Sequence, residues 1–253
     1  MEDELGSNQE RTDEYLKKFN RVNVLKSLIK SKSPVILDIG ANTGQSLREF
    51  KEIWPDSVVH CFEPQEECLA ELEKSASMFT NVFVNNFAVG SKNTEEEFYT
   101  HNIHTGISGF NKVNLESVDS IDRSKIISED GQEFKKYKNK LNHPRKVLIK
   151  RLDEYLSNES LTKIDFLKID TQGFEPEVLS GLGERLSDVG VVLTELMFYD
   201  YYERSLSFSD IEQFLLPSGF KLFNISHIAQ NPLNGRTDWV DVIYTNNKQL
   251  DIK

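Results

Sequence analysis

The chain has 253 residues, of which 38% are hydrophobic and 28% are charged, and its formal net charge at pH 7 is −11. This composition is typical of a folded globular protein rather than a disordered one. Because nucleic acids and anionic membranes are bound by basic surfaces, the charge argues against both as general partners. No apolar run approaches the length of a membrane span.

The N-terminal sequence is acidic and lacks the apolar segment of a secretory signal, so we expect a cytoplasmic protein. Cys61 and Cys68 lie in apolar runs, which indicates free buried thiols. Residues 1–11 are expected to form a disordered tail. Apolar residues recurring every three or four positions predict a helix over 12–32.

Strands and helices alternate in the cofactor-binding half that we assign to residues 33–100. The segments "VILDIG", "VVHCFEP" and "NVFVNNFAVG" are typical of buried strands, and "QSLREFKEIW" and "EECLAELEKSASMF" of the helices between them. This alternation predicts right-handed crossovers and a parallel sheet with helices on both faces.

Residues 101–146 interrupt the alternation with polar, irregular sequence that is too long for an ordinary loop. We expect a lid or substrate insertion there, either with short elements of its own or mobile. The alternation resumes over 147–253, the second half of the sheet. Its last two strands, "FKLFNISHI" and "DVIYTN", have no helix between them and predict an antiparallel pair at the sheet edge. We therefore expect a single domain over 1–253.

The first motif, "VILDIGANTGQS", has Asp38 at the end of a strand, followed by a short turn and a helix. A nicotinamide cofactor would require Gly-x-Gly-x-x-Gly, which is absent, and the Asp38 carboxylate would repel a pyrophosphate. S-adenosylmethionine (SAM) has an amino group, a positive charge and no phosphate, and suits an acid better. The turn allows close approach of a ligand to the backbone. Its five candidate cofactor residues are Gly40, Ala41, Asn42, Thr43 and Gly44.

Two further strand ends carry candidate cofactor contacts. Glu63 ends the second strand, where an acid in doubly wound folds accepts hydrogen bonds from the ribose hydroxyls, and Pro64 follows it. Asn86 and Ala88 follow the third strand, where the adenine edge is expected. Because open α/β sheets bind ligands at the carboxyl ends of their strands, the three motifs together indicate a nucleoside cofactor.

These motifs, together with "RLDEYL", "IDFLKIDTQGFEPEVLSG" and "DVIYTN", resemble the FkbM family of SAM-dependent methyltransferases from about Val35 to Asn246. The resemblance implies a class I methyltransferase fold: a Rossmann-like, mostly parallel seven-stranded α/β sheet with an antiparallel edge strand. It also implies O-methylation of a hydroxyl on a saccharide or secondary metabolite. Gln172 departs from the family, which often has Glu there. By the resemblance, the cofactor is bound by Asp38, Gly40, Asn42, Gly44 and Glu63.

Transfer of a methyl group to a hydroxyl requires an acceptor for the proton, so a base or a metal assists it. Asp170 ends the strand "IDFLKID" and Glu195 lies near the end of the next strand. Asp170 as general base is one mechanism. A Mg²⁺ ion held by both acids, as in catechol O-methyltransferase-like enzymes, is the other. No residue after Glu195 offers a third oxygen ligand, which favours the general-base mechanism over the Mg²⁺ mechanism. Capping of the next helix is the simpler interpretation of Asp170.

Two basic residues complete the set of candidates. His104 lies in a polar, glycine-containing segment and is a candidate base or hydroxyl contact, with an exposed loop histidine as the simpler interpretation. Lys168 lies inside a buried strand and is expected to pair with Asp165 or Glu195, because a buried lysine must be paired.

Two other classes of function stay open at this point. A nicotinamide-dependent oxidoreductase would use a similar fold, although Asp38 and the missing glycine argue against it. A non-catalytic SAM-binding protein would keep the cofactor motifs without using Asp170 or Glu195. The expected partner is a small-molecule or glycan acceptor.

Overall fold

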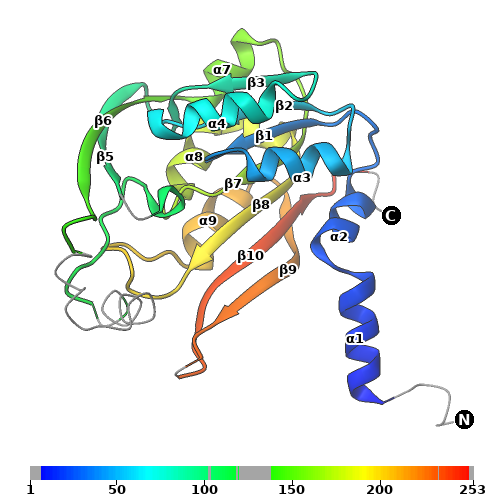
Figure 1. The fold of residues 1–253 in the computed structure, drawn as a ribbon. Coiled ribbons are helices and arrows are strands. Elements are labelled where there is room, and N and C mark those ends of the chain that lie inside the picture. The colour runs from blue at the N-terminus through cyan, green and yellow to red at the C-terminus, as the bar shows by residue number, and fades with distance from the viewer. Residues whose placement is uncertain (1–6, 102–103, 118, 120–137, 233, 251–253) are drawn as a thin grey trace, which may run out of the picture.

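The computed structural model describes residues 7–101, 104–117, 119, 138–232 and 234–250. Its centre is a seven-stranded sheet (Figure 1). The strands are β1 (Val35–Ile39), β2 (Val58–Phe62), β3 (Val82–Asn85), β7 (Ile164–Ile169), β8 (Val189–Met197), β9 (Phe220–Gln230) and β10 (Thr237–Asn246). Across the sheet their order is β3-β2-β1-β7-β8-β10-β9, which confirms the predicted sheet.

The last two strands form the antiparallel pair that the sequence predicts. The reversed strand is β10, which is also antiparallel to β8, so it lies one place in from the edge. The outermost strand is β9, and it runs in the same direction as β8. Since no helix crosses between β9 and β10, the two must run in opposite directions. The reversed strand is therefore beside the edge rather than at it.

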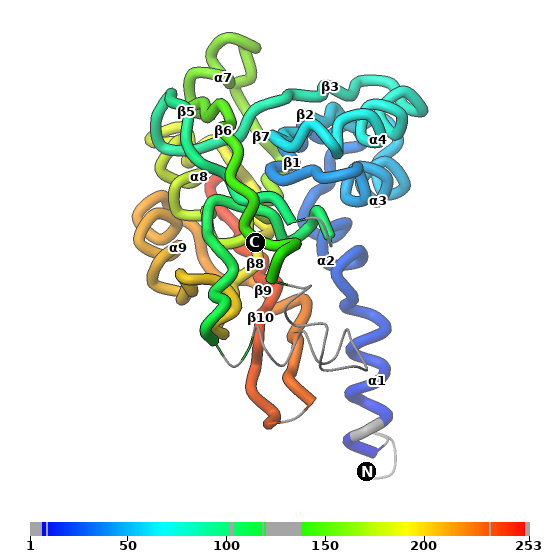
Figure 2. Tube along the Cα trace, turned by 60° about the vertical axis from the view of Figure 1, so that its left-hand side comes forward, coloured from blue at the N-terminus to red at the C-terminus, as the bar shows by residue number. Residues whose placement is uncertain are grey.

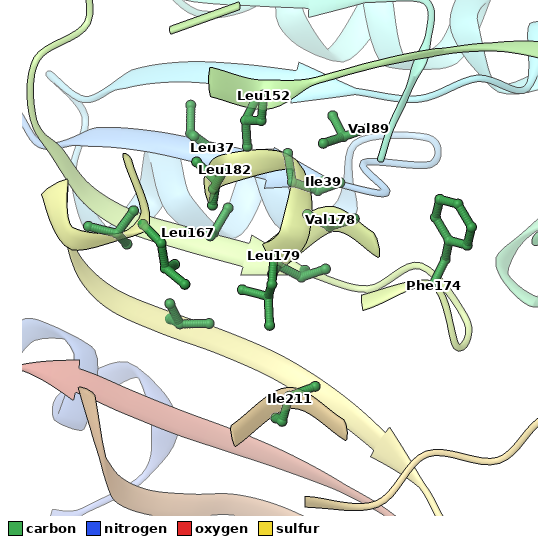
Figure 3. Packing of buried hydrophobic residues seen from close by; sticks show 14 of the residues in the cluster. Leu37, Ile39, Val89, Leu152, Leu167, Phe174, Val178, Leu179, Leu182 and Ile211 are labelled. Carbon is green, nitrogen blue, oxygen red and sulfur yellow. The ribbon is translucent and has the colours of Figure 1, made fainter. Parts of the chain in front are cut away.

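Helices cover both faces of the sheet because successive strand residues point to opposite faces. On one face, Ile36 and Phe166 pack against α2 (Arg21–Leu28), α3 (Gln45–Ile53) and α4 (Glu66–Ala76). On the other, α7 (Leu152–Asn158), α8 (Glu175–Leu182) and α9 (Phe208–Leu215) pack against Leu37 and Leu167. Figure 3 shows side chains of these three helices gathered over the sheet.

The N-terminal region forms two helices instead of the single helix expected over 12–32. α1 (Asn8–Lys18) begins earlier than expected, after a capping box formed by Ser7 and Glu10. The Asn20 side chain accepts a hydrogen bond from the backbone N–H of Asn23 and starts α2. Of these two helices, α2 contributes side chains to the core, whereas α1 extends away from the sheet (Figure 2). Of the expected tail, residues 1–6 lie outside the described part of the chain.

A second, three-stranded sheet has the order β4-β6-β5. It comprises β4 (Ala88–Val89), β5 (Thr94–Thr100) and β6 (His143–Lys150), and a short 3₁₀ helix, η1 (Thr105–Ile107), follows β5. β6 begins inside the expected insertion. Within that insertion, residues 102–103, 118 and 120–137 lie outside the described residues. None of the described helices is long and apolar enough to cross a membrane.

Candidate active site

A cleft lies at the carboxyl ends of β1, β2 and β7. The main sheet contributes Gly40, Glu63 and Asp170 to its wall. Carboxyl ends of parallel strands are where open α/β sheets bind ligands. The facing wall comes from the small sheet and the segment after it, through Phe98, Thr105, Gly106, Ser108 and Phe110.

The turn after β1 has a backbone that suits close approach of a ligand. Gly40 (φ +79°) and Asn42 (φ +46°) are both left-handed, a region that glycine and asparagine tolerate best. A Cβ atom at Gly40 would overlap the carbonyl oxygen of Asp170, so a side chain cannot be accommodated there. The turn is therefore packed directly against the end of β7.

Glu63 links the end of β2 to this turn. The residue is 2% exposed, and its carboxylate accepts hydrogen bonds from the backbone N–H groups of Asn42 (2.8 Å) and Gln65 (2.9 Å). Burial raises the pKa of Glu63, and the two backbone hydrogen bonds oppose that rise. A carboxylate anchored in this way presents a fixed acceptor to the cleft, which suits a pair of neighbouring hydroxyls.

Five of the ten predicted cofactor residues line the cleft: Gly40, Asn42, Glu63, Pro64 and Ala88. Ala41 is buried, and the Thr43 carbonyl is held by the Arg48 guanidinium (3.2 Å). Gly44 packs against Ser75 of α4, and Asn86 lies on a neighbouring groove beyond Pro64. Ala41, Thr43 and Gly44 therefore belong to the turn without lining the cleft, and Asn86 lies outside it.

Asp38 does not line the cleft either. It is fully buried on β1, directly beside Lys168 in the parallel register, and their charged groups are 3.2 Å apart. The prediction that Lys168 pairs with Asp165 or Glu195 is wrong, because Asp165 pairs with Lys163 instead. Burial lowers the pKa of Lys168, but attraction to Asp38 and Asp170 outweighs burial and raises it overall. Lys168 therefore stays charged.

Asp170 lies at the open rim of the site. Its side chain is 42% exposed, with one oxygen 3.5 Å from Lys168 Nζ and the other accepting from Gln172 Nε2 at 2.8 Å. It does not cap the next helix, because α8 follows Phe174 without a side-chain cap. The turn between them is instead held by Glu175, whose carboxylate accepts from the Thr171 backbone and hydroxyl (2.8 and 3.0 Å).

Glu195 is half-buried on β8 opposite Asp241 of β10, and it is absent from the cleft wall. Burial, aided by repulsion from Asp170 and Asp241, raises the pKa of Glu195 to about 9. Among the described residues, no group of three or more histidine, cysteine, aspartate or glutamate side chains is arranged to hold a metal ion. This donor set does not fit a Mg²⁺ site.

His104 has a local structural role. Its Nδ1 accepts a hydrogen bond from the Gly106 backbone N–H at 3.0 Å and caps η1. The ring is exposed and does not line the cleft, although Thr105 and Gly106 do. This arrangement agrees with the simpler interpretation of a loop histidine.

The facing wall of the cleft contains residues that the sequence did not reveal. The Thr105 hydroxyl donates to the Asn42 side chain (3.0 Å), and Gln65 Nε2 donates to the Thr105 carbonyl (3.3 Å). The Tyr202 hydroxyl donates to Gln172 Oε1 at 2.8 Å. These contacts join segments far apart in the chain, so no local sequence pattern predicts which residues meet.

The strand order, the single reversed strand and the cleft with its strand-end acid define a class I methyltransferase fold. The protein-family model of the methyltransferase FkbM domain matches residues 38–222 of the sequence. The chain therefore belongs to this methyltransferase family. The predicted family and enzyme class are thus confirmed, and the oxidoreductase alternative finds no support.

Two known proteins show how far the similarity extends. Over 193 residues the chain is 28% identical to the 2-O-methyltransferase NoeI of Sinorhizobium fredii (strain NBRC 101917 / NGR234), covering 76% of this chain and 74% of that protein. The crystal structure of methyltransferase FkbM from Methylobacillus flagellatus KT matches with a TM-score of 0.52 and 15% identity. That match covers 92% of this chain but 50% of the other, and it shows the fold alone.

Proposed function

We propose that the protein is a SAM-dependent O-methyltransferase that acts on a hydroxyl of a saccharide or secondary metabolite. The observation that carries this proposal is a single cleft with Glu63 at one strand end and Asp170 at another, two strands away. Since neighbouring strands lie about 4.8 Å apart, the two strand ends are separated by about 10 Å. One nucleoside cofactor can thus contact both.

The residues of the cleft fit SAM. Glu63 would accept the ribose hydroxyls, and the bare backbone at Gly40 leaves room for the methionine portion. Pro64, Ala88 and Phe98 provide an apolar wall for the adenine. Bound SAM would supply the methyl group from its sulfonium centre, and its demethylated form, S-adenosylhomocysteine, would be the leaving group.

Asp170 is the proposed catalytic residue. Its exposed carboxylate can accept the hydroxyl hydrogen of the acceptor and hold the oxygen toward the methyl group. Alignment of the two substrates supplies a further part of the rate enhancement. No step of this mechanism uses a metal ion. The relative NoeI, named a 2-O-methyltransferase, supports oxygen as the atom that is methylated.

The net charge of −11 supports a small-molecule or glycan acceptor over a nucleic acid. The test is a methyl-transfer assay with SAM over a panel of neutral and amino glycans, scored by the mass gain of one methyl group. The wild type should modify at least one glycan, and Asp170→Asn should lose most of that activity while still binding S-adenosylhomocysteine (SAH). Cofactor binding without transfer to any hydroxyl compound would instead support a non-catalytic SAM-binding protein.

A further inference from the structure

Four residues around the acid that ends β2 form a closed ring of hydrogen bonds. The Glu63 carboxylate accepts from the backbone N–H groups of Asn42 (2.8 Å) and Gln65 (2.9 Å), one on each oxygen. The Thr105 hydroxyl donates to Asn42 Oδ1 at 3.0 Å, and Gln65 Nε2 donates to the Thr105 carbonyl at 3.3 Å. Thr105 therefore contacts both of the residues whose backbone holds Glu63.

The direction of each side-chain hydrogen bond in the ring is fixed by the groups that make it. Asn42 Oδ1 also accepts from the Thr43 backbone N–H at 2.9 Å, so this atom is an oxygen and the Thr105 hydroxyl must donate to it. A carbonyl can only accept, so Gln65 presents its amide nitrogen to Thr105. The Cys68 thiol also lies against the Thr105 side chain. The hydroxyl oxygen can accept from the thiol while its one hydrogen goes to Asn42.

The ring fixes the orientation of the Glu63 carboxylate. Because a separate backbone N–H holds each oxygen, the carboxylate cannot rotate about its terminal bond without breaking a hydrogen bond. Burial raises the pKa of Glu63, and backbone and side-chain hydrogen bonds from Gln65 are among the contacts that oppose the rise. The amide nitrogen of Gln65 has two hydrogens, so it can serve Glu63 and the Thr105 carbonyl together. A preorganised acceptor binds a ligand more tightly because less side-chain freedom is lost on binding.

Thr105 belongs to the wall of the cleft that faces the main sheet. It is the first residue of η1, which the His104 ring caps, and it lines the cleft. Asn42 lies 63 positions away in the chain, in the turn after β1. The two contacts of Thr105 therefore connect the facing wall to the turn and to the end of β2 at once.

We propose that Thr105 is a positioning residue for cofactor binding, which acts through Asn42 and Gln65 to hold the Glu63 carboxylate in the orientation that accepts the ribose hydroxyls. The proposal rests on the role proposed above for Glu63. A residue that only stabilises η1 would change the binding of every ligand of the cleft alike. A residue that positions Glu63 changes the binding only of ligands that use Glu63.

The test is isothermal titration calorimetry of the full chain with SAH. Thr105→Val keeps the shape of the side chain and is expected to weaken SAH binding by about 3- to 10-fold, because one neutral hydrogen bond is lost. Thr105→Ser keeps the hydroxyl and should bind within about twofold of the wild type. The matched control is Thr245→Val, which removes a buried hydroxyl that also donates to an asparagine oxygen, Asn247 Oδ1 at 3.3 Å. Thr245 does not line the cleft, so the affinity should stay unchanged.

Two comparisons show whether Thr105 acts through Glu63. In a Glu63→Gln background, Thr105→Val should weaken SAH binding by less than about twofold, because residues that act through one contact are not additive. With an SAH analogue that lacks both ribose hydroxyls, the loss caused by Thr105→Val should also fall below about twofold. A loss of the same size in both backgrounds, or with both ligands, would overturn the proposal.

Gln65→Met tests the other half of the ring and serves in place of Thr105→Val if thermal denaturation shows that variant to be unfolded. It keeps the backbone N–H that holds Glu63 and removes the amide that contacts Thr105. Weaker binding of SAH but not of the analogue without ribose hydroxyls is expected. Unchanged SAH binding in Gln65→Met would contradict a role for the ring.

The outcomes separate this proposal from the proposed function. Absence of SAH binding by the wild type would refute the proposed cofactor and the role of Thr105 together. Binding that Glu63→Gln weakens and Thr105→Val leaves at full strength would refute the role of Thr105 alone. Methyl transfer to a glycan in that case would leave the proposed reaction standing.

Discussion

Lys168 and Asp38 lie side by side on the parallel strands β7 and β1, with their charged groups 3.2 Å apart and Asp38 entirely buried. Lys168 also donates to the carbonyl of Gly40, in the turn that lines the cleft. The pair therefore connects the buried interior of the sheet to the site at its rim.

Replacing Lys168 by methionine leaves the buried Asp38 carboxylate without its counter-charge. The expected loss of unfolding free energy is about 3–5 kcal/mol, measured by urea denaturation. The matched control is Lys163→Met, which breaks the more exposed pair with Asp165 and should cost about 1 kcal/mol or less. Equal losses of unfolding free energy in the two variants would show that the buried pair stabilises the fold no more than the exposed pair does.

Glu63→Gln is expected to weaken SAH binding by about 10- to 100-fold, because a charged hydrogen-bond acceptor for the ribose is lost. Isothermal titration calorimetry measures the effect. Glu71→Gln, on the exposed side of α4, is the control and should leave the affinity unchanged. Full affinity in Glu63→Gln would exclude Glu63 as the ribose contact.

Gly40→Ala should abolish detectable SAH binding and lower stability by several kcal/mol, because the new methyl group would overlap the Asp170 carbonyl. Gly235 provides a matched control, since it has a similar φ of +76° but no atom within 4 Å of the position that a Cβ would take. Gly235→Ala should cost only about 1 kcal/mol from backbone strain, with binding intact. Calorimetry and thermal denaturation of both variants compare the two effects, and similar losses would refute the steric argument.

The buried Glu175 is expected to make the free energy of unfolding depend on pH. Burial raises the pKa of Glu175 from 4.5 to about 7, so the folded protein holds this proton more tightly than the unfolded chain does. This contribution to stability is complete below pH 4.5 and is lost as the pH rises through about 7, by up to about 3 kcal/mol. Glu175→Gln should remove that part of the decline when urea denaturation is repeated across this range. A decline as steep as that of the wild type would assign it to other groups.

Chelation of divalent cations is expected to change the rate of methyl transfer by less than about twofold. The reason is that, among the described residues, no group of three or more histidine, cysteine, aspartate or glutamate side chains is arranged to hold a metal ion. The measurement compares transfer in EDTA with transfer in added Mg²⁺. Loss of activity in EDTA that Mg²⁺ restores would show that a divalent cation takes part in the transfer.

Local sequence patterns were sufficient for the strands and for the acids at their ends. Alternation of apolar strands and amphipathic helices requires a parallel sheet, and the carboxyl ends of parallel strands meet at one edge. The sequence alone therefore predicts that Glu63 and Asp170 lie at a common edge of the sheet. The break between α1 and α2 was missed, although Asn20 is a helix-capping residue.

By itself, the sequence determined the order of the elements, the glycine turn and which acids end strands, because these depend on neighbours a few positions away. Only the tertiary structure decided the partner of Lys168, which the register of β1 and β7 sets between segments far apart in the chain. It also decided the facing wall of the cleft and the contact of Tyr202 with Gln172. Such contacts join distant segments, and apolar periodicity indicates which face of an element is buried but not which distant residue it meets.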